Sequence, residues 1–134
     1  MRMCTGKALL LVCIFWVLGM PMAHAAPGDI HIVFIPKSSD QVFWELMRAG
    51  VDRAVQEDPH IKLTWRGPAH NDDTEAQIKI VQLYTKAGVD AIVIAPTDRA
   101  RLVEPIKKAV AMGISVISVD SGLDGNQHVN FVTS

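Results

Sequence analysis

Short apolar runs alternate along this chain with longer amphipathic segments, and this alternation restricts the possible folds more than any other feature. Four runs rich in β-branched residues have the length of strands. They occupy residues 30–36, 61–66, 91–95 and 114–119. Helix-length segments, with apolar residues three to four positions apart, lie between them at residues 40–54, 73–88 and 98–112. Repeated strand, helix and strand predict right-handed crossovers and a mainly parallel sheet.

Two of the strand runs, residues 32–35 and 91–95, are entirely apolar. Such runs are typical of a sheet that is buried on both faces. We therefore expect an α/β fold of the doubly wound type, in which helices cover both sides of a mainly parallel sheet.

Capping residues mark the expected ends of the helices. Asp40 can cap the first helix, and Asp73 or Thr74 the second, because a side-chain oxygen there can accept from free backbone N–H groups. Gly88 is suited to end the second helix, since glycine adopts the left-handed conformation without strain. Pro105 lies inside the third helical segment, so we expect either a kink or a later start of that helix.

Residues 1–25 have the layout of a secretory signal peptide that is cleaved at its end. The start is basic at Arg2 and Lys7, an apolar run covers residues 8–18, and small residues precede the cleavage position. A membrane anchor is the alternative, but the run is shorter than the roughly 20 residues that a spanning helix needs. A lipoprotein signal is a weaker alternative, because both cysteines precede the end of the run. We expect a periplasmic domain formed by residues 26–134.

The composition of that domain excludes several classes of function. Cys4 and Cys13 both lie in the leader, so the domain needs no disulfide framework. Removing the leader takes away two of the 13 basic residues and none of the 14 acidic ones, which leaves the domain mildly acidic. No basic stripe indicates nucleic acid, and no second long apolar run indicates a membrane span. The histidines lack metal-ligand spacing, so we predict neither a metal nor a cofactor.

Polar residues follow each predicted strand, and open parallel sheets bind their ligands at this end. These strand ends comprise residues 36–41, 70–73, 96–99 and 120–122. Ordinary loops are polar too, so composition alone is weak evidence for ligand contact at any one residue. Asp120 could instead order its own turn, and Asp98 with Arg99 could cap and solvate the third helix.

Several short motifs, in order and correctly spaced, resemble a known family. They are IPKSSDQVFW at residues 35–44, D-x-x-x-Q at 73–77, GVDAIVIAPTD at 88–98 and VISVD at 116–120. Together they resemble the N-terminal lobe of periplasmic sugar-binding proteins of the ribose-binding type, which feed ABC importers. The resemblance extends over essentially all of residues 26–134.

The resemblance implies that a sugar binds in a cleft between two similar lobes. Polar groups after the first strand, aromatic residues in the first turn of the first helix and an aspartate after the fourth strand would contact it. These positions and the residue after the aspartate are Lys37, Gln41, Phe43, Trp44, Asp120 and Ser121. Sugar hydroxyls need charged or amide partners, whereas the C–H faces of the ring need flat aromatic surface.

Two positions depart from the ribose-binding pattern. Lys37 stands where that branch has a small neutral hydroxyl residue, and Ser121 stands where it has an arginine. The Pro-Lys pair after the first strand is more similar to the rhamnose- and autoinducer-2-binding branches. We therefore expect a deoxy sugar, a pentose or hexose, or an autoinducer-2-like compound, rather than plain ribose.

Phe43 and Trp44 are adjacent on the first helix and point about 100° apart, so one can be buried while the other is exposed. The apolar pattern places Phe43 on the buried face, which leaves Trp44 as the better candidate for stacking on a sugar. That face comprises Phe43, Leu46, Met47, Gly50, Val51 and Ala54.

Family members are about twice as long as this chain, so the resemblance implies one lobe of a longer protein, truncated within or after a fifth strand. Its partners would be a small sugar and an ABC importer permease. A sensor that presents the sugar to a chemoreceptor or sensor kinase is an alternative that the residues leave open. A lac-repressor-type regulator would need a DNA-binding module where this chain has a leader. A receiver domain would need an acidic cluster at the strand ends, and an enzyme a nucleophile with its base, so we predict no enzymatic activity.

Overall fold

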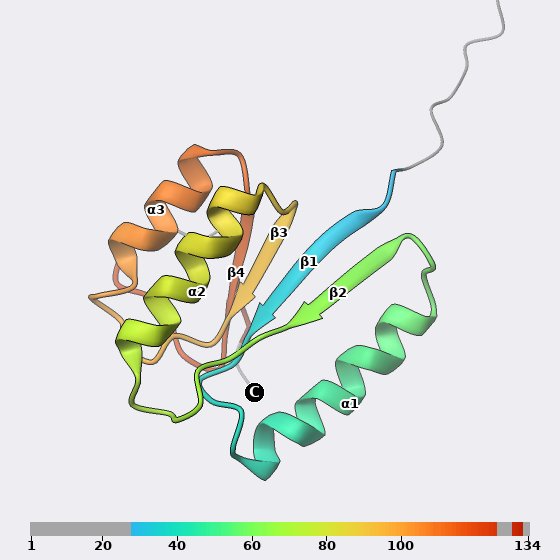
Figure 1. Ribbon diagram of the computed structural model, residues 1–134, viewed down its shortest axis with the longest axis horizontal. Helices are drawn as coiled ribbons and strands as arrows, with labels where there is room; N and C mark the ends of the chain where they lie inside the picture. Colours follow the sequence, from blue (N-terminus) through green and yellow to red (C-terminus); the bar gives the residue numbers. More distant parts are fainter. Residues whose placement is uncertain (1–27, 126–129, 133–134) are drawn as a thin grey trace, which may run out of the picture.

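A computed structural model describes residues 28–125 and 130–132 of the chain, so the predicted signal peptide lies outside the described residues. Strands and helices alternate from residue 30 to residue 119 (Figure 1). The elements are β1 (Ile30–Ile35), α1 (Val42–Gln56), β2 (Ile61–Trp65), α2 (Thr74–Ala87), β3 (Ala91–Ile94), α3 (Val103–Ala111), β4 (Ser115–Val119) and β5 (Asn130–Val132). The four predicted strands and three predicted helices are confirmed, and β5 is the expected fifth strand.

All strand pairs are parallel, and the order across the sheet is β2-β1-β3-β4-β5. β1 therefore has two neighbours, and its Ile32 lies opposite Leu63 of β2 and Ala91 of β3. The chain runs outward in one direction from β1 to β2 and in the other direction from β3 onward. This reversal between β1 and β3 is the feature that creates a ligand crevice in open α/β sheets.

Helices cover both faces of the sheet, which confirms the doubly wound α/β fold. Figure 1 shows α2 and α3 together on one face and α1 on the other. The main core lies beneath α2 and α3, where the largest fully buried aliphatic side chains gather. They are Ile35, Ile92, Ile94, Leu102 and Ile106. None of the described helices is long and apolar enough to cross a membrane.

Local signals at the helix ends explain most of the observed boundaries. The Asp73 carboxylate accepts from the backbone N–H of Ala76 at 2.8 Å, which is the expected cap of α2. Gly88 ends the same helix in the left-handed conformation, with φ at 69°. Of the kink and the later start expected for the third helix, the structure shows the later start, because α3 begins at Val103 and places Pro105 in its first turn, where no backbone N–H is needed.

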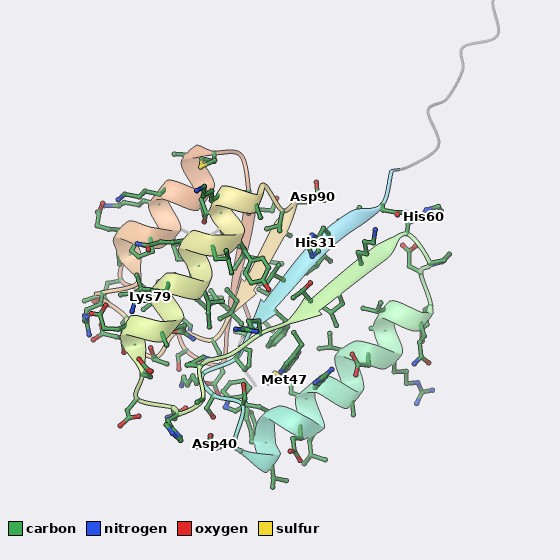
Figure 2. The ribbon with its side chains drawn as sticks, in the orientation of Figure 1. His31, Asp40, Met47, His60, Lys79 and Asp90 are labelled. Carbon is green, nitrogen blue, oxygen red and sulfur yellow. The ribbon has the colours of Figure 1, made fainter. Side chains whose placement is uncertain are left out.

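The predicted cap of the first helix is wrong. Gln41, not Asp40, is the N-cap residue of α1, and its side chain makes no capping hydrogen bond. Asp40 lies in the loop before α1 (Figure 2), and its carboxylate is 3.2 Å from the Nδ1 atom of His70. The competing partner thus comes from the loop after β2, which the local sequence around Asp40 does not reveal.

Candidate functional site

Three of the candidate residues meet at the carboxyl end of the sheet. Lys37 follows β1 and Asp120 follows β4, with the end of β3 between them. The Lys37 ammonium nitrogen lies 2.7 Å from Oδ2 of Asp120 and 2.6 Å from Oγ of Ser121. The Ser121 hydroxyl in turn donates to the same Asp120 oxygen at 3.0 Å. We refer to Lys37, Asp120 and Ser121 as the lysine–aspartate cluster.

The lysine–aspartate cluster offers both a hydrogen-bond donor and an acceptor to a ligand. The Lys37 and Asp120 side chains remain 22% and 26% exposed, so a small molecule can reach them. Both hydrogen bonds to the carboxylate end on Oδ2, which leaves Oδ1 without a donor among the described residues. The ammonium can donate to one hydroxyl group of a ligand, while the free oxygen of the carboxylate accepts from an adjacent hydroxyl group.

Asp120 is ionised at neutral pH. Burial raises the pKa of its carboxyl group, but the hydrogen bonds from Lys37 and Ser121 and the Lys37 charge outweigh that effect and hold the pKa below the ordinary 3.8. The cluster therefore presents a charged pair, not a neutral acid and amine.

The backbone at Asp120 is held in an uncommon conformation. Its φ of 61° lies in the left-handed region, which aspartate tolerates better than most residues, at a cost of about 1 kcal/mol. The Asp120 N–H donates to the carbonyl of Val132 in β5 at 3.0 Å, and the Ser121 N–H donates to Val119 at 2.6 Å. Pairing with β5 thus holds the turn, and the turn aims the carboxylate toward Lys37. Backbone strain of this kind is frequent at ligand sites.

The loop after β2 supports the loop that carries Lys37. A Cβ atom added to Gly67 would lie 2.8 Å from Cγ of Pro36, so glycine is required for this approach. The Ser39 N–H also donates to the carbonyl of Pro68 at 2.9 Å. These contacts leave Pro36, and with it the start of the Lys37 residue, little room to move.

The predicted burial of the two aromatic residues of α1 is wrong. Trp44 is buried, with 3% of its surface exposed, whereas Phe43 is 47% exposed. Their rings meet edge to face, with centroids 4.8 Å apart and planes at 81°. The predicted buried face is also wrong in part, since Leu46 is 71% exposed, whereas Met47 and Val51 are half-buried as expected. Trp44 has more apolar surface to bury than Phe43, so packing against the sheet favours the tryptophan.

Gln41 and Trp44 are not joined to the lysine–aspartate cluster by hydrogen bonds within the described residues. Gln41 is exposed at the start of α1, and its backbone carbonyl accepts from the Trp44 N–H at 3.0 Å. Trp44 lines a separate pocket of about 520 Å³ with Trp65, Arg48 and Arg66. Phe43 is therefore the exposed aromatic side chain of α1, and the buried Trp44 ring packs against it.

The histidines that the structure describes give no sign of a metal site. Figure 2 shows His31 and Asp90 close together at the amino end of the sheet, where the backbone N–H of His31 donates to the Asp90 carboxylate at 2.7 Å. The His31 ring lies 2.9 Å from the hydroxyl of Thr64. No three His, Cys, Asp or Glu side chains of the described residues gather as metal ligands would.

A family described as periplasmic binding protein domains matches residues 32–134 of the chain. The chain belongs to this family. The match extends from within β1 to the end of β5 and therefore includes every residue of the lysine–aspartate cluster.

Sugar-binding members of the periplasmic binding protein family are among the relatives. A D-ribose/D-allose-binding protein of Pseudomonas aeruginosa is 34% identical over 120 residues, which are 87% of this chain and 37% of the relative. The crystal structure of an ABC transporter solute-binding protein from Agrobacterium vitis with bound D-fucose matches with a TM-score of 0.75 and 30% identity. That match covers 78% of this chain and 37% of the other.

A third relative is an ABC transporter solute-binding protein from Burkholderia multivorans, whose crystal structure holds an unknown ligand. It is 35% identical with a TM-score of 0.70, over 72% of this chain and 35% of the other. The resemblance to the ribose-binding type of periplasmic protein is confirmed by these matches. This chain spans little more than a third of the length of such relatives.

The sequence did not reveal the role of one further residue of this periplasmic binding protein domain. Gln77, near the start of α2, is fully buried, and its Nε2 atom donates to the carbonyls of Pro36 at 3.1 Å and Ala95 at 2.9 Å. Its Oε1 atom accepts from the N–H and the hydroxyl of Thr97, both at 2.9 Å. A polar residue in register with the buried Ile80 was the signal that could have identified it.

Proposed function

We propose that this chain provides one wall of a sugar-binding site in a periplasmic solute-binding protein that serves an ABC importer. The lysine–aspartate cluster is the observation that supports this most directly. It lies at the carboxyl ends of β1 and β4, where α/β sheets bind ligands, and it pairs a donor with an acceptor within 2.7 Å. The relatives named above as binding D-ribose, D-allose or D-fucose support the choice of a sugar.

The proposed contacts follow from the chemistry of a sugar. Asp120 accepts from one or two hydroxyl groups through Oδ1, and Lys37 donates to a neighbouring hydroxyl or ring oxygen. Phe43 offers its exposed ring to the C–H face of the sugar. Gln41, at the end of the loop that carries Lys37, supplies a side-chain amide. In this arrangement Trp44 contributes by supporting Phe43, not by stacking on the ligand itself.

The proposed site is a half-site. Most of the length of each relative lies outside the region that this chain matches, and we propose that a second lobe closes over the ligand and completes its hydrogen bonds. Delivery to an importer permease follows from the same proposal. No observation favours the sensor alternative, which remains a prediction from the sequence.

Amide chemical-shift mapping of the 134-residue chain tests the half-site directly, because it detects binding in the millimolar range. D-Fucose, D-allose and D-arabinose should shift the resonances of Lys37, Asp120 and Ser121, whereas glycine and glutamate should not. Lys37→Met should abolish these shifts.

Lys62→Met is the matched control for this experiment. Lys62 lies near the amino end of the sheet, 74% exposed, and its ammonium is 3.9 Å from Asp29. This variant should keep the shifts of the parent chain. If amino acids shifted the cluster and no sugar did, the proposed ligand class would be wrong.

A further inference from the structure

One buried amide joins the ends of the two central strands. Gln77 lies on α2, but its side chain reaches the residues that directly follow β1 and β3, namely Pro36 and Ala95. We propose that Gln77 is a positioning residue that sets where the Lys37 ammonium lies relative to Asp120. The inference rests on the proposed sugar site for its meaning, but its test does not require a sugar.

The position requires a primary amide. The ladder between β1 and β3 ends where the Ala95 N–H donates to the Ile35 carbonyl at 2.9 Å. Beyond that bond the carbonyls of Pro36 and Ala95 both need donors, and among the described residues only Gln77 supplies them. The NH₂ group of glutamine offers two donors from one atom, and its oxygen remains free to accept from Thr97.

The effect of the amide reaches Lys37 through the covalent chain. The carbonyl carbon of Pro36 and the nitrogen of Lys37 share one planar peptide unit, so fixing the carbonyl direction fixes the plane. Pro36 has a restricted φ, and its ring is confined by Gly67. The Lys37 side chain starts from this fixed plane and must cross the end of β3 to reach Asp120. Gln77 also binds the end of β3. It therefore fixes both the peptide from which the Lys37 side chain starts and the strand end over which that side chain passes.

The alternative is that Gln77 has a purely structural role. A variant at a second buried polar residue of α2 distinguishes this role from positioning of Lys37. Thr85 is 7% exposed, and its hydroxyl donates to the Val81 carbonyl at 2.8 Å. It lies toward the other end of α2 and touches neither strand end. Thr85→Val therefore removes a buried hydrogen bond from the same helix but leaves the loop after β1 unchanged.

The experiment compares isotope-labelled samples of the 134-residue chain, as the parent, Gln77→Met and Thr85→Val. Methionine has a volume similar to that of glutamine and no donor. At neutral pH, the nuclear Overhauser contact between the side chains of Lys37 and Ser121 should be present in the parent and in Thr85→Val. It should be lost in Gln77→Met. The titration midpoint of the Asp120 carboxyl carbon should rise toward its ordinary 3.8 in Gln77→Met only.

An Overhauser contact and a titration midpoint that are unchanged in Gln77→Met would overturn the proposal, whatever happens to stability. If Gln77→Met does not fold, Gln77→Asn replaces it, because its amide is one methylene shorter and cannot span both carbonyls. The Asn variant must then show the same two changes, and a cluster identical to that of the parent would overturn the proposal. Since no sugar is present, failure of the sugar-binding experiment would leave this result intact.

Discussion

Lys37→Met removes the ammonium group that joins the carboxyl ends of β1 and β4. A hydrogen bond to a charged group contributes about 1.5–3 kcal/mol, whereas an exposed ion pair contributes about 0.2–1 kcal/mol. The Lys37 and Asp120 side chains are 22% and 26% exposed, so solvent screens this pair in part. We therefore expect the free energy of unfolding to fall by about 1–2 kcal/mol, between those two limits. Urea unfolding at neutral pH measures the change.

A double-mutant cycle with Asp120→Asn isolates the interaction itself. Asparagine keeps the shape of the side chain and tolerates the left-handed φ of 61°, so the substitution removes the charge without changing the strain. We expect a coupling energy of about 1 kcal/mol between Lys37 and Asp120. The exposed pair of Lys62 and Asp29, 3.9 Å apart, is the control and should show almost none. Equal coupling energies for the two pairs would refute the reasoning.

The same pair predicts a pH dependence of stability. In the folded state burial raises the pKa of Asp120, but Lys37 and Ser121 together hold it below 3.8, and the unfolded chain lacks these contacts. A depressed pKa stabilises the folded state above the unfolded value, and this contribution is lost as the pH falls below 3.8 through the folded pKa. Lys37→Met should therefore flatten the stability curve in this acid range. Identical acid limbs in the parent and the variant would contradict the assignment.

Three further predictions concern the leader, a glycine and the aromatic pair. Sequencing of the exported product should find Ala26 at the mature N-terminus, and an uncleaved membrane-bound chain would contradict this. Gly67→Ala should lower the free energy of unfolding by about 1–3 kcal/mol because its Cβ would overlap a proline ring at 2.8 Å, whereas Gly50→Ala, with open space in α1, should be neutral or stabilising. Trp44→Ala should destabilise the chain by about 3 kcal/mol, and Phe43→Ala should weaken sugar-induced shifts with little loss of stability; the reverse pattern would restore the original assignment of the two rings.

Signals carried by neighbouring residues were sufficient for most of the fold. The apolar runs located the strands and Gly88 located the end of α2, while Pro105 predicted either a kink or a late start of α3, because each depends on local backbone preferences. The meeting of Lys37 with Asp120 was expected from the resemblance to sugar-binding proteins. The sequence pattern alone placed both residues at strand ends. It did not give the order of the strands, which decides whether the two residues meet.

Features that depend on tertiary packing could not be predicted in this way. The rotation of α1 about its axis decides between Phe43 and Trp44, and both settings satisfy a helical pattern with apolar residues on two sides. Asp40 had a plausible local role as a cap, but His70 from a distant loop binds it instead. Gln77 was recognised only as part of the D-x-x-x-Q motif, since nothing nearby in the sequence shows that the carbonyls of Pro36 and Ala95 face it.

The order of strands in the sheet also has a consequence for folding kinetics. Lys37 and Asp120 are separated by 83 positions in the sequence, and a loop of that length costs about 4 kcal/mol to close by the logarithmic rule, before any constant. This entropic cost is offset only when β3 pairs with β1 and β4 pairs with β3. We therefore expect the Lys37–Asp120 pair, and with it the proposed ligand site, to form only after the sheet is nearly complete and to be absent from an early transition state. A bound sugar should then slow unfolding while leaving the folding rate unchanged.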